Sequence, residues 1–120
     1  MEKIVPVLQL SSSAVTRPRG REAFTRLVGY LDDYESVQID LRSTELISSS
    51  FLDEVVLSLK AMDVLDRVVF LVTDLAVRQR LANIAAVRDA QIFYRTHEKS
   101  PKEIILPHEY PGLELKRAKA

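Results

Sequence analysis

A run of three serines, Ser48 to Ser50, precedes an apolar stretch with helical spacing that begins at Phe51. A serine acts as a nucleophile only with a base and an orienting acid beside it, and the Gly-x-Ser-x-Gly pattern of hydrolases is missing from the sequence. The start of a helix offers different chemistry, because its unpaired N–H groups and partial positive charge can hold a phosphate. We therefore expect no catalytic residue here, and we expect the serine run to bind or dock.

The same residues also fit a purely structural role. Ser50 and Asp53 have the spacing of a capping box, in which the serine side chain accepts a hydrogen bond from the first helical turn. Such a cap typically contributes about 1 kcal/mol and requires no function. Asp53 and Glu54 would also place two negative charges in the first turn, where they satisfy the helix dipole and repel a phosphate. The capping and docking roles both stay open.

Arginines cluster before and within the first helix-like stretch, at Arg17, Arg19, Arg21 and Arg26. Guanidinium groups bind phosphates and carboxylates, so a polar loop over residues 11–18 and its neighbours could hold a small ligand or nucleotide. The ligand-binding candidates are Arg17, Arg19 and Arg21. The alternative is a solvated basic loop, because no aromatic residues alternate with these arginines as they do in single-stranded nucleic-acid sites.

Composition excludes several kinds of site and partner. The 120 residues suit one domain, and 47% hydrophobic residues are enough for one core. Without cysteine there is no disulfide or thiolate metal site, and His97 and His108 are expected at the surface, with no metal and no cofactor. The 17 basic and 17 acidic residues balance, which argues against nucleic-acid binding. No signal-peptide pattern or membrane-length apolar run occurs, so we expect a cytoplasmic protein without membrane contact.

Strand-like and helix-like segments alternate along the chain, which indicates βαβ crossovers. The predicted fold class is α/β, a single domain over residues 1–95 with a mainly parallel mixed sheet and helices packed against it. Pro6 cannot donate a ladder hydrogen bond, so the first strand is expected at a sheet edge. The run from Val68 to Val72 is apolar throughout, as in a central strand. The expected strands are 4–10, 37–41, 68–72 and 92–94, and the expected helices are 19–31, 51–62 and one capped by Thr73 or Asp74.

The stretch around the serine run resembles the STAS domain, the fold of bacterial anti-sigma-factor antagonists. That family has a strand ending in Asp-Leu, a short turn, and then Asp-Ser-Ser-Gly-Leu at the start of a helix. The positions that match are Asp40 and Leu41 at the strand end, Ser49 and Ser50 at the serine pair, and Leu52 at the final leucine. The resemblance covers roughly residues 4 to 95.

The match departs from the family pattern at three positions. Ser48 replaces the second acid, Phe51 replaces the glycine, and Asp53 stands where a small residue is common. With Ser-Ser-Ser-Phe-Leu-Asp-Glu, the chain is similar to a divergent STAS-like group of unknown function. Members of that group are often associated with histidine-kinase-like ATPase domains.

The resemblance implies a regulatory protein-interaction module and no enzyme. In regulatory STAS proteins the serine of this turn is phosphorylated by a kinase partner, and by matched position it is Ser50 here, with Ser49 as the second candidate. The implied partner is a histidine-kinase-like ATPase or an anti-sigma factor that docks on the turn and the following helix. Phe51 is an exposed anchor or a core residue, and its i, i+4 relation to Val55 favours the core. The implied partner-binding residues are Asp40, Ser48, Ser49, Ser50, Phe51 and Asp53.

Two other functions stay open. One is a ligand-binding module that uses the arginines and the C-terminal ends of the parallel strands, where open α/β sheets bind ligands. The other is a structural subunit whose tail, residues 97–120, mediates self-association. Within the C-terminal extension 96–120, Ile104 to Leu106 could form one more short strand or dock on a partner. Its last residues, Lys116 to Ala120, are expected to be disordered.

Overall fold

The computed structural model of the protein describes residues 1–107, and it confirms the predicted α/β class. One five-stranded sheet has the order β1-β2-β3-β4-β5, so the first strand lies at an edge, as its proline predicts. The first four strands are parallel and β5 is antiparallel to β4. The strands are β1 (Glu2–Pro6), β2 (Ser36–Asp40), β3 (Val68–Leu71), β4 (Ile92–Arg95) and β5 (Glu103–Ile105).

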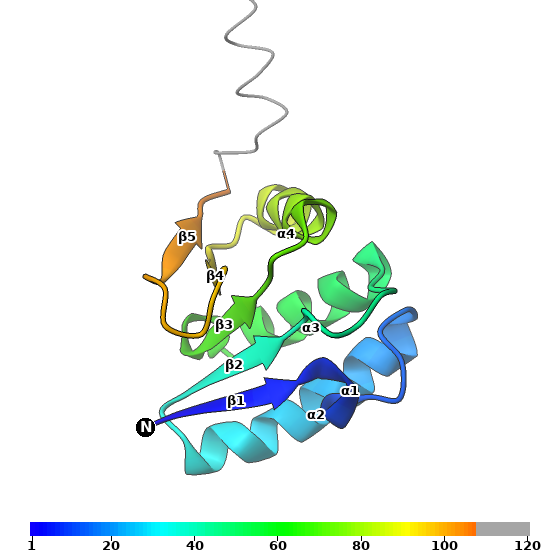
Figure 1. Ribbon diagram of the computed structural model, residues 1–120. Helices are drawn as coiled ribbons and strands as arrows, with labels where there is room; N and C mark the ends of the chain where they lie inside the picture. Colours follow the sequence, from blue (N-terminus) through cyan, green and yellow to red (C-terminus); the bar gives the residue numbers. More distant parts are fainter. Residues whose placement is uncertain (108–120) are drawn as a thin grey trace, which may run out of the picture.

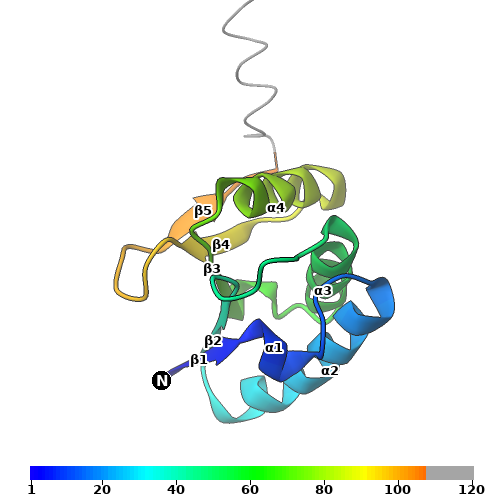
Figure 2. The same cartoon turned by 45° about the vertical axis from the view of Figure 1, so that its right-hand side comes forward.

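The three long helices cover one face of the sheet (Figures 1 and 2). They are α2 (Arg17–Asp33), α3 (Ser49–Ala61) and α4 (Leu75–Arg88), and the short segments α1 (Val7–Leu10) and η1 (Leu65–Arg67) complete the fold. Because the parallel strands follow one another in chain order, each right-handed crossover places its helix on the same side. Within residues 1–107 the strand order does not reverse, so the described sheet lacks the switch point at which open α/β sheets usually bind ligands.

The core lies between these helices and the sheet. Each long helix contributes a leucine with no exposed surface, namely Leu27, Leu59 and Leu81. All four residues of β3 are buried, as expected for a central strand. On the helix-free face, Glu2 of β1 forms an ion pair with Arg95 of β4 at 3.0 Å, so charged side chains shield the middle of the sheet there.

Two predicted boundaries near the N-terminus are wrong. The strand expected over 4–10 ends at Pro6, and α1 follows, because proline has no N–H to continue the ladder. The helix expected from Arg19 begins at Arg17, so residues 11–18 are not all loop. Thr16 caps this helix, since its hydroxyl oxygen accepts a hydrogen bond from the Arg19 N–H at 3.4 Å.

The sheet extends past residue 95, because Glu103–Ile105 pairs with β4. Of the two roles left open for Ile104 to Leu106, the structure shows the short strand, over Glu103–Ile105. Asp74, one of two candidate caps, accepts hydrogen bonds from the first turn of α4. His97 is exposed, whereas His108 and the segment Lys116 to Ala120 lie outside the described residues.

Helices α2 and α3 lie close together at Gly20, and this contact generates a stability prediction. A Cβ at this position would lie 2.7 Å from the Phe51 carbonyl oxygen and 2.9 Å from the Glu54 Cβ. We expect Gly20→Ala to lower the free energy of unfolding in urea by about 1–3 kcal/mol, because the helices must move apart.

Gly29→Ala is the matched control on the same helix, since a Cβ there meets nothing within 4 Å. Alanine favours the helix over glycine, so this change should raise the free energy of unfolding by about 0.5–1 kcal/mol. Equal effects of the two substitutions would contradict the close contact.

Candidate functional site

The first turn of α3 is fixed by Ser48, so the predicted capping box of Ser50 and Asp53 is wrong. Ser48 has extended backbone angles, φ −88° and ψ 158°, and its Oγ accepts a hydrogen bond from the Phe51 N–H at 3.0 Å. The same hydroxyl donates to the carbonyl oxygen of Val15. The helix thus begins two residues earlier than expected, and its cap is tied to the loop before α2.

Because Ser48 is the cap, Ser49 and Ser50 occupy the first helical positions with exposed side chains. Both line a groove of about 310 Å³ that runs between the start of α3 and the second half of α4. Val87 on α4 is 76% exposed and lines the same groove. The remaining lining residues are Arg17, Asp53, Asn83 and Ile84.

Asp53 joins three helices at the floor of this groove. Its carboxylate accepts two hydrogen bonds from the Arg88 guanidinium of α4, at 2.8 and 2.7 Å. Arg17 of α2 reaches the same carboxylate at 2.8 Å. The hydrogen bonds from Arg88, with those from Arg17, hold the pKa of Asp53 below its usual range against the opposing effect of burial. Because its pKa is lowered, Asp53 is ionised at neutral pH, although the residue is only 8% exposed.

Glu54, the second acid near the start of α3, is also paired. It lies 3.7 Å from a guanidinium nitrogen of Arg17 and 3.5 Å from one of Arg21. The two acids that were expected to repel a phosphate therefore have arginines as neighbours. The repulsion inferred from the sequence is offset by charges that only the folded chain brings close.

The arginines of the cluster lie on a helix and are paired with carboxylates, so they do not form a loop of unpaired cations. Arg17, Arg19 and Arg21 all lie on α2. Arg19 forms an ion pair with Glu22 at 2.7 Å, and Arg26 lies 3.7 Å from the same glutamate. Because every one of these arginines has a carboxylate neighbour, a ligand phosphate would have to displace an existing partner.

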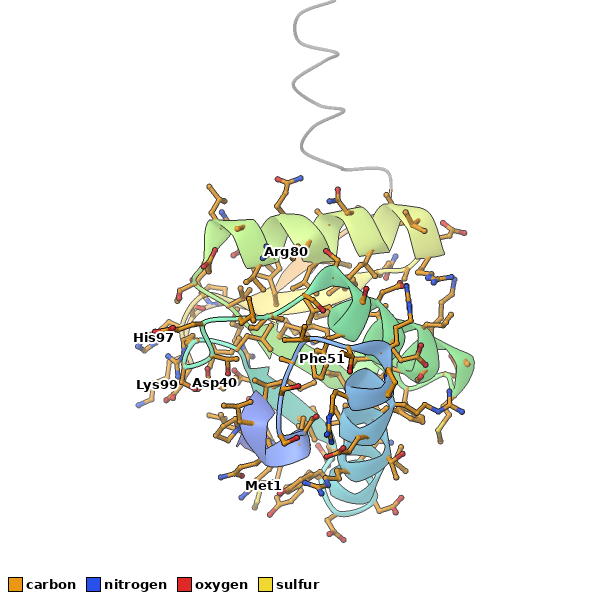
Figure 3. All side chains as sticks on the ribbon, turned by 90° about the vertical axis from the view of Figure 1, so that its right-hand side faces the viewer. Met1, Asp40, Phe51, Arg80, His97 and Lys99 are labelled. Atoms are coloured by element: carbon orange, nitrogen blue, oxygen red, sulfur yellow. The ribbon has the colours of Figure 1, made fainter. Side chains whose placement is uncertain are left out.

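Asp40 lies apart from the serine turn. At the end of β2 it accepts hydrogen bonds from the Arg42 backbone N–H and guanidinium, at 2.9, 3.0 and 2.9 Å. These hydrogen bonds from Arg42 lower the pKa of Asp40. Arg42 also binds Glu98 at 3.0 Å, so Asp40 faces the loop of His97 rather than the start of α3 (Figure 3).

Phe51 is 1% exposed and belongs to the core, which confirms the favoured prediction and leaves no exposed anchor at this position. Of the predicted partner-binding residues, the structure brings together Ser48, Ser49, Ser50, Phe51 and Asp53 at one helix start. Only Ser49 and Ser50 present exposed side chains there. Arg88 is the residue that sequence reasoning missed, because nothing near it in the sequence signals a partner 35 positions earlier.

Comparison with protein-family models, with curated proteins and with solved structures finds no match to this chain. Within residues 1–107, no three His, Asp or Glu side chains are grouped so that they could hold a metal ion. None of the described helices has the length and apolar character needed to span a membrane. The function of the groove is therefore inferred from its own residues.

Substitution of Ser48, which caps α3, and of Ser50, which lies in its first turn, should affect stability differently. We expect Ser48→Ala to lower the free energy of unfolding by about 1 kcal/mol, because the Phe51 N–H loses its side-chain acceptor. Ser50→Ala should change it by less than about 0.5 kcal/mol, as at an ordinary surface position. Urea unfolding of both variants measures this, and a larger loss for Ser50→Ala would contradict the cap.

Asp53→Asn should destabilise the protein at neutral pH, by about 1–2 kcal/mol, because a charged acceptor of several hydrogen bonds is lost. Since the folded state lowers the pKa of Asp53, its contribution is present above the ordinary pKa and disappears as the pH falls below about 4. The difference between wild type and Asp53→Asn should thus shrink on acidification from pH 6 to pH 3.

The control is Glu22→Gln, which removes the surface ion pairs with Arg19 and Arg26. We expect it to change the free energy of unfolding by at most about 0.5 kcal/mol at neutral pH. A wild-type advantage over Asp53→Asn that stays constant between pH 6 and pH 3 would contradict the ionised, arginine-bound carboxylate.

Proposed function

We propose that this chain is a regulatory protein-interaction module of the STAS-like type and that it catalyses no reaction. Its docking surface comprises Ser49 and Ser50 of α3 with the groove residues Arg17, Asn83 and Val87, and we call it the serine surface. The proposed partner is a histidine-kinase-like ATPase or an anti-sigma factor, met in the cytoplasm. The segment from Asp40 to Leu52 resembles the STAS motif, and this resemblance supports the choice of these two kinds of partner.

One observation carries the proposal. Among the residues of the serine motif, Ser49 and Ser50 alone have exposed side chains, while the others are used inside the fold. Ser48 caps the helix, Phe51 is packed in the core, and Asp53 is bound by two arginines. Two exposed hydroxyls beside an exposed Val87 offer a partner both hydrogen bonds and apolar contact.

Phosphorylation of Ser50, or of Ser49, is the proposed switch. The first turn of a 13-residue helix presents free N–H groups, which favour a phosphate. Arg17 is half exposed at the same groove, so it can turn from Asp53 toward a new dianion. A phosphate adds nearly two negative charges, which would remove a partner that binds the unmodified hydroxyls.

The ligand-binding alternative has less support. Its arginines are already paired with carboxylates, and the five described strands show no reversal of order at which a ligand crevice would open. The serine surface needs neither feature, because protein docking uses an exposed patch rather than a deep pocket.

A pull-down from the native host tests the proposal. Wild-type protein should retain one ATPase or anti-sigma partner, identified by mass spectrometry, and Ser50→Asp should lose it because a negative charge enters the serine surface. We expect at least about a tenfold drop in the retained partner, which corresponds to 1.4 kcal/mol of binding free energy.

Thr25→Asp is the control, since Thr25 is an exposed residue in the middle of α2 and adds the same charge elsewhere. It should retain the partner as wild type does. Equal retention by wild type and Ser50→Asp, or capture of no partner by wild type, would contradict the proposed function.

A further inference from the structure

A second groove, of about 390 Å³, lies between α4 and the strands β4 and β5, which are neighbours of that helix in Figure 2. Its volume lies in the range of small-molecule pockets, about 300–1,000 Å³. The helix contributes four side chains that share one face at spacings of three and four residues, namely Leu75, Arg78, Gln79 and Ala82. None of the residues that line this groove belongs to the serine surface.

Part of the groove is apolar and open to water. Leu75 is 67% exposed, although its side chain is large and apolar. Ala82 and Ile105, which also line the groove, are nearly buried and belong to the core cluster. The apolar part of a ligand could therefore rest on the core and cover Leu75, which would remove apolar surface from water.

The groove is also lined by a cation, the half-buried Arg78. Within residues 1–107, Arg78 forms no ion pair, whereas Arg17, Arg19, Arg21 and Arg26 of α2 each have a carboxylate neighbour. A ligand anion could bind Arg78 without displacing a carboxylate of the described chain. The groove thus differs from the arginine cluster of α2, where such a partner is already present.

Tyr94 of β4 holds this cation in place. The guanidinium carbon of Arg78 lies over the Tyr94 ring, 5.8 Å from its centre. An aromatic ring attracts the cation through its π face and takes up no N–H donor in a conventional hydrogen bond. The planar guanidinium is therefore positioned while its donors stay available for a carboxylate.

The charges around Tyr94 limit the charge of the ligand. Burial raises the pKa of Tyr94, and the negative charge of Glu103 raises it further, so the hydroxyl keeps its proton at neutral pH. Glu103 is thus close enough to the groove to repel a second negative charge. One guanidinium with a carboxylate nearby favours a monoanion over a phosphate dianion.

We propose that this groove binds a small monocarboxylate with an apolar body, of the aryl or alkyl acid class. The carboxylate accepts hydrogen bonds from Arg78, and the Gln79 amide supplies a further donor. The apolar body lies against Leu75, Ala82 and Ile105. The proposal is independent of the serine surface, because the two grooves share no residue.

Titration of the full-length, ¹⁵N-labelled protein with 4-phenylbutyrate tests the proposal. We expect saturable chemical-shift changes in amides around the groove, with a Kd of about 1 mM or tighter for a ligand of about 12 non-hydrogen atoms. The uncharged 4-phenylbutanol should bind at least about tenfold more weakly, because it cannot form a charge-assisted hydrogen bond with Arg78. Acetate, which has the charge without the apolar body, should give no saturable change over the same concentrations.

Two substitutions separate the contributions of charge and apolar contact. Arg78→Gln should weaken the binding of 4-phenylbutyrate at least about tenfold, because the carboxylate loses its cation. Leu75→Ala should weaken it about threefold, because less apolar surface is covered. Unchanged amide shifts in β1 and β2, far from the groove, check that each variant is folded.

Arg80→Gln is the matched control. It removes the same charge from the same helix, but Arg80 points about 200° away from Arg78 around the helix axis and does not line the groove. Its Kd should stay within about twofold of that of wild type, as for a surface charge without contact to the ligand.

Four results would overturn the inference. An equal Kd for wild type and Arg78→Gln, or for the acid and the alcohol, would show that Arg78 does not recognise a carboxylate. No saturable change at ten times the expected Kd would show that the groove does not bind this class of ligand. Groove amides that respond to protein concentration and not to the acid would identify a second copy of the chain as the occupant.

Discussion

The carboxylate of Asp53 is the point on which the proposed docking surface depends. One buried charge receives arginines from two other helices, Arg88 of α4 at 2.7 Å and Arg17 of α2 at 2.8 Å. An ionised carboxylate this far from solvent is stable only with such partners, so the start of α3 is held between α2 and α4. Arg17 and Asp53 line the same groove as the exposed Ser49 and Ser50.

The topology explains why the functional features gather at particular edges. The three long helices of the described chain lie on one face of the sheet. The groove between α3 and α4 lies at the start of α3 and the end of α4, where the side chains are mostly polar. The opposite face has no helix among the described residues and is shielded by charged side chains such as Glu2 and Arg95. β5 is the last described strand, and none of the described helices follows it, so a groove stays open between β5 and α4.

Sequence patterns predicted the fold class, the edge position of the first strand and the burial of Phe51, because these depend on local periodicity and on the missing N–H of Pro6. They failed at the cap of α3, since three consecutive serines offer the same local chemistry and only the contact of Ser48 with Val15 selects one of them. They also missed Arg88, whose partner is distant in sequence and adjacent only after α4 packs on α3. The motif also grouped Asp40 with the serine turn as an implied partner-binding residue, whereas its carboxylate is bound by the neighbouring Arg42.

The most direct test of the serine surface is site-specific photo-cross-linking in the native host, with a photoreactive amino acid placed at position 50 or, in a separate protein, at position 25. Both positions are exposed, but only the first lies on the serine surface. The proposed function predicts a covalent adduct with one ATPase or anti-sigma partner from position 50 and none from position 25. An adduct with the same partner from position 25 alone, or no adduct from position 50, would contradict it.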